Sequence, residues 1–380
     1  MEFFKYYNPT RIIFGKNTIS EIGEYIKEYG YNKVLILYGG GSIFSNGVYS
    51  EVSKSLQLND IISVEFGGVQ PNPTLDHARA AIRIIKDNNI QAILAVGGGS
   101  VIDEAKSIAA GCYVDDVWNI FEKTESVKKA LPLFTVLTLS ATGTEMNSFA
   151  VLSNTEQKKK WAFGSPFSYP LVSIIDPQVQ MTLPWRQTVN GGVDALSHIM
   201  ELYFAGDSAE ATLSINEALM RTVIKSVDEL QKDPNDYDSR ANLAWSASLA
   251  LSGLTAVGMN GGEWSVHRIE HSISAYYANV AHAEGLAVIF PAWMKYVNKQ
   301  NSERFERWAK NVFGVDSINE GIDALINTFK RWGAPTSLAD LNVPSEMIEQ
   351  IAQNSMLLGI VGNKHKIDLD ASRSILNLAL

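Results

Sequence analysis

The chain has 380 residues, of which 46% are hydrophobic and 19% are charged, and its formal net charge is -9. This length favours two domains over a single core. The negative charge argues against a nucleic-acid partner and against attraction to an anionic membrane. No apolar run is long enough to span a bilayer, and the first residues lack the apolar core of a signal peptide. We therefore expect a cytoplasmic protein without a membrane partner. The single cysteine, Cys112, excludes an internal disulfide and a multi-cysteine zinc site.

The first half of the chain alternates between apolar runs and amphipathic segments. The predicted strands cover 11–15, 33–38, 61–66, 91–96, 132–139 and 171–176, and the predicted helices cover 19–29, 48–56, 75–88 and 100–110. Runs such as 33–38 are apolar throughout, which is typical of parallel strands buried on both faces. The alternation predicts a doubly wound, Rossmann-like α/β domain with a parallel sheet over residues 1–184. A hairpin is expected from 151–154 and 160–163.

The second half has the pattern of helices alone. The predicted helices cover 188–202, 209–231, 236–251, 262–277, 285–298, 303–313, 318–332, 345–353 and 371–378. Each carries apolar residues at the spacing of one helical face. We therefore expect an all-helical domain over residues 185–380.

A glycine-rich turn, Gly97-Gly98-Gly99-Ser100, lies between a predicted strand and a predicted helix. In that context backbone N–H groups and the positive end of the helix dipole bind phosphate. Taken alone, such a sequence is more often an ordinary tight turn. Further along the helix, Asp103 and Lys106 have equally ordinary interpretations as a capping carboxylate and a solvated lysine.

A second turn, Gly39-Gly40-Gly41-Ser42, follows the strand at 33–38 and contains no acidic residue. The usual Gly-x-Gly-x-x-Gly fingerprint is absent. An acid at this place would bond a ribose 2′-hydroxyl and repel a 2′-phosphate, so its absence favours NADP(H) over NAD(H). Small and hydroxyl residues after the strand at 132–139 suit contacts with cofactor phosphate and ribose, or form a polar turn.

Four of the six histidines lie in the stretch from Asp194 to His282. Asp194 and His198 are four residues apart, as are His267 and His271, so each pair shares one helical face. Carboxylate and imidazole ligands suit Fe(II) or Zn(II) better than Mg or Ca. A single Asp–His pair is more often a surface or capping pair, and spacing alone does not choose between His267 and His271 as a ligand.

Five motifs together resemble the iron-containing (group III) alcohol dehydrogenase family, and the resemblance covers essentially the whole chain. They are Gly-Gly-Gly-Ser-Val-Ile-Asp-Glu-Ala-Lys at 97–106, Ala-Thr-Gly-Thr-Glu-Met-Asn at 141–147, Asn-Gly-Gly-Val-Asp-Ala-Leu-Ser-His at 190–198, His-Arg-Ile-Glu-His at 267–271 and Ala-His-Ala-Glu-Gly at 281–285. The resemblance implies a dehydroquinate synthase-like fold. Within the family, the Tyr-Gly-Gly-Gly-Ser loop and the stretch Trp-Ser-Val-His-Arg-Ile-Glu-His look most like the NADPH-dependent butanol dehydrogenase and aldehyde reductase branch.

The resemblance also implies roles for individual residues. The metal ligands would be Asp194, His198, His267 and His282, with His271 beside the substrate and not a ligand. The pyrophosphate would lie on Gly97, Gly98, Gly99 and Ser100, near Asp103. The remaining cofactor contacts would come from Thr138, Thr142 and Lys160, the last at the nicotinamide ribose or carboxamide, and from Gly39, Gly40 and Ser42 around the 2′-phosphate.

The implied reaction is reversible hydride transfer between NADP(H) and a primary alcohol or aldehyde. Fe(II) or Zn(II) would act as a Lewis acid, and the catalytic residues would be His271, Asp194 and His198. An apolar pocket for the substrate is expected from Phe149, Trp161, Phe163 and Trp264, although aromatic residues are more often core. The resemblance also implies a homodimer, which we expect to form through the predicted strand at residues 11–14.

Three alternatives remain open. A zinc-dependent polyol dehydrogenase of the glycerol type, using NAD, would need only an Asp/His/His site. A sugar-phosphate cyclising synthase of the same superfamily would need a basic phosphate pocket, which the helical half does not show. A non-catalytic protein would bind nucleotide and metal without turnover.

Overall fold

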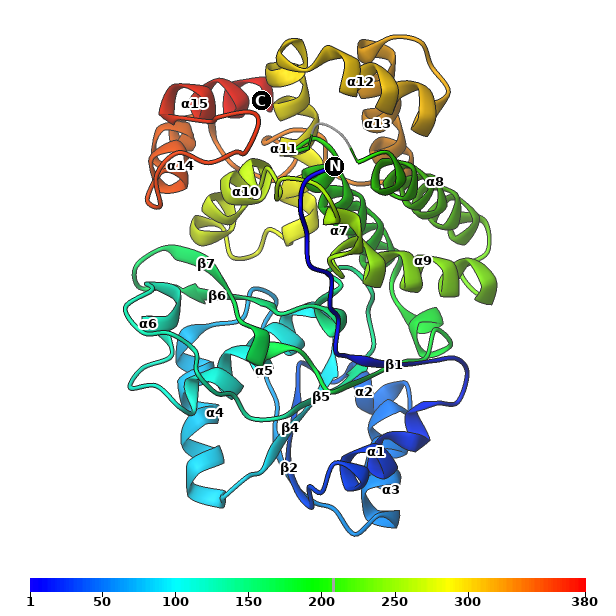
Figure 1. Cartoon of the computed structure of the whole chain (residues 1–380), viewed down its shortest axis with the longest axis vertical. Helices are drawn as coiled ribbons and strands as arrows, with labels where there is room; N and C mark the ends of the chain where they lie inside the picture. The colour runs from blue at the N-terminus through cyan, green and yellow to red at the C-terminus, as the bar shows by residue number, and fades with distance from the viewer. Residues whose placement is uncertain (207–208) are drawn as a thin grey trace. The chain divides into compact units, whose positions relative to one another are not determined.

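The computed structural model describes residues 1–206 and 209–380. The chain divides into two compact units, one formed by Tyr7–Leu183 and the other by Met1–Tyr6 together with Pro184–Leu380. Figure 1 shows that the strands of the parallel sheet belong to the first unit and that helices make up most of the second. We refer to them as the sheet unit and the helical unit.

The first six residues pack with the helical unit, whereas the sequence-based expectation placed 1–184 in the α/β domain. They belong to the helical unit, where the backbone N–H of Glu2 donates to the carbonyl of Gly258 at 3.0 Å. Met1 packs against Gly258, and the ring of Tyr6 packs against Gly253. These contacts join segments far apart in the sequence, so no local pattern could have assigned Met1–Tyr6 to the helical unit.

The sheet unit is built on six parallel strands in the order β1-β8-β5-β4-β2-β3. The strands are β1 (Arg11–Phe14), β2 (Lys33–Tyr38), β3 (Ile62–Phe66), β4 (Ala92–Gly97), β5 (Leu133–Leu137) and β8 (Val172–Ile175). The helices are α1 (Ile22–Glu28), α2 (Ser42–Ser45), α3 (Val48–Leu58), α4 (Leu75–Asn88), α5 (Gly99–Gly111) and α6 (Trp118–Phe121). The expected parallel, doubly wound sheet is confirmed.

Both faces of the sheet are covered, as the apolar runs predicted. Val34 and Ile36 of β2 belong to a core shared with Ile22 and Ile26 of α1 and with Val52 of α3. Leu35 and Leu37 face the opposite way, because successive side chains of a strand point to opposite faces, and they too are fully buried. The expected hairpin is present as β6 (Phe149–Asn154) and β7 (Lys159–Gly164).

The strand order reverses between β2 and β4. The chain passes from β2 outward to β3, then returns to β4 and continues in the other direction through β5 and β8. The loops after β2 and β4 therefore flank the switch point of the sheet, where open α/β sheets bind their ligands.

The helical unit contains the helices expected after residue 185. They are α7 (Trp185–Tyr203), α8 (Glu210–Lys232), α9 (Tyr237–Ala250), α10 (Ser265–Tyr276), α11 (His282–Val297), α12 (Ser302–Trp308), α13 (Ile318–Trp332), α14 (Ile348–Ser355) and α15 (Leu369–Leu378). Apart from one isolated bridge between Val361 and Ile367, β-structure is absent from the described part of this unit. Within the described residues, every helix is too short or too polar to cross a bilayer.

Most of these helices begin and end within three residues of the expected bounds, and the differences at α11 and α12 have a physical cause. α11 begins at His282 and not at residue 285, because the side chain of Glu284 accepts a hydrogen bond from the backbone N–H of Ala281 and caps the first turn. α12 ends at Trp308 and passes into a π-helical turn over Ala309–Phe313, a change of hydrogen bonding that apolar spacing does not reveal.

Lys106 on α5 corrects the interpretation as a solvated lysine, because its side chain is fully buried. Its ammonium group donates to Oγ1 of Thr144 at 2.7 Å, to the carbonyl and Oδ1 of Asn147 at 2.8 and 3.0 Å, and to the carbonyl of Phe149 at 2.8 Å. Lys106 therefore fastens the loop after β5 to α5.

We predict that Lys106→Met lowers the free energy of unfolding by about 3 kcal/mol, because several buried acceptors lose their donor at once. Urea denaturation of the whole chain, followed by the fluorescence of its tryptophans, measures this. Lys54→Met, at an exposed position of α3, is the control and should change stability little. Equal stability of the two variants would show that the buried ammonium does not hold the loop.

Candidate functional site

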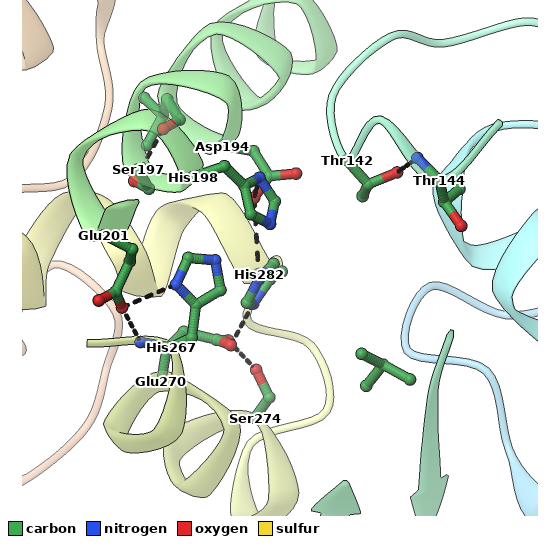
Figure 2. A network of polar contacts seen from close by, with 12 residues as sticks. Thr142, Thr144, Asp194, Ser197, His198, Glu201, His267, Glu270, Ser274 and His282 are labelled. Carbon is green, nitrogen blue, oxygen red and sulfur yellow. Dashed lines mark hydrogen bonds and ion pairs between the residues drawn. The ribbon is translucent and has the colours of Figure 1, made fainter. Parts of the chain in front are cut away.

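The histidine-rich stretch comes together in the helical unit, where three helices contribute to one cluster (Figure 2). Asp194 and His198 lie on α7, His267 on α10, and His282 is the first residue of α11. One ligand atom from each of Asp194, His267 and His282 lies within 4.8 Å of the others. His198 borders this group: its Nδ1 is 3.5 Å from Oδ1 of Asp194, and its ring centroid is 4.7 Å from that of His267.

His271 lies at the edge of the same cluster. Its ring centroid is 5.3 Å from that of His282 and 6.5 Å from that of His267. The structure thus brings together all five residues that the sequence singled out in this half of the chain. Of the two histidines on α10, His267 belongs to the group of donor atoms around Asp194, and His271 does not.

The donor atoms of this cluster fit a divalent metal ion. Oδ1 of Asp194, Nδ1 of His198 and Nε2 of His267 are buried, and none has a hydrogen-bond partner within residues 1–206 and 209–380. Buried polar atoms in folded proteins nearly always have a partner. Burial lowers the pKa of His198 to about 3, against the opposing effect of Asp194, so its imidazole is neutral and carries a lone pair. A carboxylate with neutral imidazoles is the ligand set that Fe(II) and Zn(II) accept.

The candidate cofactor residues lie in the sheet unit, at the carboxyl ends of neighbouring strands. Tyr38 of β2 pairs with Val96 of β4, and Gly97 of β4 pairs with Leu137 of β5. The loops that follow these three strands therefore start side by side. The predicted residues lie in these loops or at the element ends that border them: Gly39, Gly40, Ser42, Gly97, Gly98, Gly99, Ser100, Thr138 and Thr142.

The loop after β4 meets the segment after β5 at very short range. A Cβ atom at Gly99 would lie 2.6 Å from Cγ2 of Thr142, and one at Gly98 would lie 3.2 Å from Cβ of Leu139. The backbone N–H of Thr138 donates to the carbonyl of Gly97 at 3.0 Å. Close packing alone therefore requires glycine at position 99. Gly98 is the N-cap residue of α5, and no side chain caps this end of the helix. The backbone N–H groups of the first turn are therefore available to a phosphate group.

The loop after β2 has room for a ligand. Gly40, Gly41 and Ser42 are exposed, and no described atom lies within 4 Å of a Cβ built at Gly40 or at Gly41. A phosphate group at this loop would meet backbone N–H groups and a serine hydroxyl, and the four residues 39–42 include no carboxylate.

Two further cofactor candidates have structural partners of their own. Asp103 does not cap α5, which corrects that interpretation: its carboxylate accepts hydrogen bonds from Oγ1 of Thr144 at 2.6 Å and from the backbone N–H of Val151 at 3.1 Å. It therefore joins α5 to the start of the hairpin. Lys160 is buried on β7, opposite Ser153.

The aromatic residues expected around the substrate fall into two groups. Trp161 stacks on Trp118 with centroids 5.6 Å apart, and Phe163 packs edge-on against Phe121 at 5.1 Å, both within the sheet unit. Trp264 instead lies beside the histidine cluster, 5.4 Å from the ring of His267 and 6.4 Å from that of His198. Only Trp264 therefore borders the candidate metal site within its own unit.

Sequence reasoning missed two buried carboxylates beside the cluster, Glu201 and Glu270. Their spacing was a readable signal, since Glu201 follows His198 by three residues on α7 and Glu270 follows His267 by three on α10. Both lie on the face of the helix that carries the candidate ligands.

Comparisons with known proteins cover both units. The family described as "Iron-containing alcohol dehydrogenase" matches residues 9–177, and "Fe-containing alcohol dehydrogenase family, C-terminal" matches residues 188–380. The chain is 40% identical to "Probable NADH-dependent butanol dehydrogenase 1" of Bacillus subtilis and 35% identical to "NADPH-dependent aldehyde reductase YqhD" of Escherichia coli, over the full length of both chains in each case. The crystal structure of NADH-dependent butanol dehydrogenase A from Thermotoga maritima superimposes with a TM-score of 0.98 at 50% identity, covering 100% of this chain and 99% of that one.

Glycine-rich loops at strand ends in one unit and an Asp–His cluster in the other fit a metal-dependent nicotinamide dehydrogenase. The matches to both parts of the family decide the assignment: the chain belongs to the iron-containing alcohol dehydrogenase family. It is an alcohol dehydrogenase or aldehyde reductase, and the family implies a nicotinamide cofactor and a divalent metal, typically iron.

We predict that Asp194→Ala and His198→Ala each retain less than about a tenth of the metal that the wild type binds, because each removes a donor from the cluster. Metal content after refilling with Fe(II) or Zn(II), measured by elemental analysis of desalted protein, is the test. His77→Gln, in the sheet unit, is the control for loss of a histidine and should bind metal fully. Wild-type metal content in both alanine variants would remove Asp194 and His198 from the ligand set.

Proposed function

We propose that this protein reduces aldehydes to primary alcohols, and catalyses the reverse reaction, with NADP(H) and one divalent metal, Fe(II) or Zn(II). The observation that carries the proposal is the set of buried donor atoms on Asp194, His198 and His267 that have no hydrogen-bond partner in the described residues. The names of the relatives supply the substrate class, since they are a butanol dehydrogenase and an aldehyde reductase.

The metal ligands in this proposal are Asp194, His198, His267 and His282. When bound, the metal supplies a Lewis acid that polarises the substrate carbonyl, and the nicotinamide supplies the hydride. The four residues orient the substrate oxygen by fixing where that Lewis acid lies. His271 is not a ligand in the proposal. It carries the proton between the substrate oxygen and solvent, because it lies beside the ligand His282 and is partly exposed.

Cofactor binding is assigned to the sheet unit. The pyrophosphate lies on the N-terminus of α5, at Gly97, Gly98, Gly99 and Ser100, and Asp103 holds the neighbouring loop in place. Contacts to the rest of the dinucleotide come from Thr138, Thr142 and Lys160. The proposal of NADP(H) rests on the loop after β2, where Gly39, Gly40 and Ser42 would contact a 2′-phosphate: the loop contains no carboxylate to repel that group, and the space around Gly40 is open. The relatives' names do not support this choice: four relatives at 39–40% identity and the Thermotoga maritima structure are named NADH-dependent, whereas the Escherichia coli aldehyde reductase at 35% identity is named NADPH-dependent.

A homodimer completes the proposal. β1 is an end strand of the six-stranded sheet, and an end strand is where a second copy of the chain can extend the sheet. The proposed contact is formed by Arg11–Phe14 of both copies.

The first test is turnover with butyraldehyde on protein that has been stripped with a chelator and refilled with Fe(II) or Zn(II) without oxygen. We expect metal-dependent oxidation of NADPH and slower oxidation of NADH. Turnover with NADH alone would contradict the assignment of the loop after β2 and leave the metal chemistry standing. Absence of turnover with either cofactor, in protein that holds metal, would overturn the proposed reaction.

We predict that Gly40→Asp raises the KM for NADPH about tenfold, which corresponds to about 1.4 kcal/mol, and does not raise the KM for NADH. The new carboxylate repels a 2′-phosphate, and the space around Gly40 accepts the side chain. Gly40→Asn has nearly the same shape without the charge and is the matched control. If the two variants change the KM values for both cofactors equally, the size of the new side chain, and not its charge, is what affects cofactor binding.

A further inference from the structure

Two buried carboxylates beside the candidate metal ligands have no part in the proposed reaction. Glu201 on α7 and Glu270 on α10 are both 0% exposed. Each bonds the Nδ1 atom of a histidine in the cluster (Figure 2): Glu201 bonds His267 with Oε1 at 2.9 Å from Nδ1, and Glu270 bonds His282 through Oε2. A bond at Nδ1 leaves Nε2 as the atom that can face a metal.

These bonds cross from one helix to the next. Glu201 reaches from α7 to His267 on α10, and Glu270 reaches from α10 to His282 at the start of α11. On α7, Glu201 lies at i+7 from Asp194 and at i+3 from His198, so one helical face carries two proposed ligands and the carboxylate that orients a third. The same arrangement recurs on α10, where Glu270 follows His267 by three residues.

Glu201 holds both the backbone and the ring of His267. Its Oε1 accepts a hydrogen bond from the backbone N–H of His267 at 3.0 Å as well as the contact from Nδ1. The ring nitrogen on the other side, Nε2, is buried and has no hydrogen-bond partner in the described chain. The carboxylate therefore fixes which nitrogen of His267 carries the proton and which presents its lone pair.

Glu270 is held in place by its own helix and by a glycine of the next one. Oγ of Ser274, one turn further along α10, donates to Oε1 of Glu270. A Cβ atom at Gly285 would lie 2.6 Å from Cγ of Glu270 and 3.3 Å from its Oε1. Glycine is a poor helix former, and Gly285 lies buried in the first turns of α11, so its presence needs a reason. The space that it leaves for Glu270 is that reason.

We propose that Glu201 and Glu270 are positioning residues of the metal centre and that Gly285 is required to seat Glu270. The inference rests on the proposed function, since it takes His267 and His282 as metal ligands. Each carboxylate selects the tautomer with Nε2 open and fixes the plane of the imidazole ring. Loss of such a partner typically weakens metal binding 10–100-fold.

The test measures Zn(II) affinity of stripped protein by competition with a chromophoric chelator. We expect Glu201→Gln and Glu270→Gln to bind Zn(II) about 10–100-fold more weakly than the wild type. Gly285→Ala should weaken binding in the same direction as Glu270→Gln, although it removes no polar group. The Gly285→Ala variant also tests the role of Glu270 if the Glu270→Gln variant does not fold.

The matched control is Glu217→Gln. Glu217 is a buried carboxylate of the same unit that bonds Tyr203, Arg307 and Asn311 and contacts none of the proposed ligands. Its loss should reduce thermal stability and leave Zn(II) affinity within about twofold. A second measurement separates positioning from stability: at saturating Co(II), the visible absorption spectrum of Glu201→Gln should differ from that of the wild type, and that of Glu217→Gln should not.

The outcomes distinguish the inference from the proposed function. A wild-type protein that binds no metal would overturn both. A wild type that binds Zn(II), with the Glu201, Glu270 and Gly285 variants within about twofold of it, would overturn the inference and leave the proposed function in place. Weakening by Glu217→Gln as large as that by Glu201→Gln would assign the effect to general destabilisation and would likewise overturn it.

Discussion

The helical unit depends on one constraint, which is that a carboxylate and several imidazoles must lie together inside an apolar core. Polar atoms buried without partners cost free energy, and Asp194, His198 and His267 each carry such an atom. The surrounding helices hold them there by close packing, with Trp293, Trp308 and other large side chains fully buried in the same core. A metal ion that accepts these lone pairs therefore also removes a free-energy cost of the fold, so binding and folding are linked.

The sheet unit follows a second constraint, the geometry of parallel strands. Because β2, β4 and β5 are neighbours with the same direction, the loops after them start from one edge of the sheet. The contact between Gly99 and Thr142 shows how closely two of these loops pack. Lys106 on α5 holds the loop after β5 through hydrogen bonds to Thr144 and Asn147. Burying an ammonium group costs free energy unless hydrogen bonds compensate for the lost water, and four acceptor atoms do so here.

Most elements could be placed from the sequence because their causes are local. The apolar run at 33–38 is β2, the amphipathic pattern at 75–88 is α4, and that at 318–332 is α13. Errors occurred where the cause was distant. Lys106 looks like any lysine of an amphipathic helix until its acceptors, about 40 residues further on, fold over it. Glu201 and Glu270 each follow a histidine by three residues on their own helix, which is a local signal, but the histidines that they bond lie on other helices.

The sequence by itself determined the types of donor and their spacing along each helix, and its five motifs carried the resemblance to the family. It also determined the parallel sheet, because runs that are apolar throughout can be buried only when both faces are covered. Only the tertiary structure decided that Met1–Tyr6 join the helical unit, that Lys106 is buried, and that Nε2 of His267 is the nitrogen without a partner. The physical reason is that a tautomer, a buried charge or a docked terminus is set by partners across space, and periodicity along the chain carries no information about them.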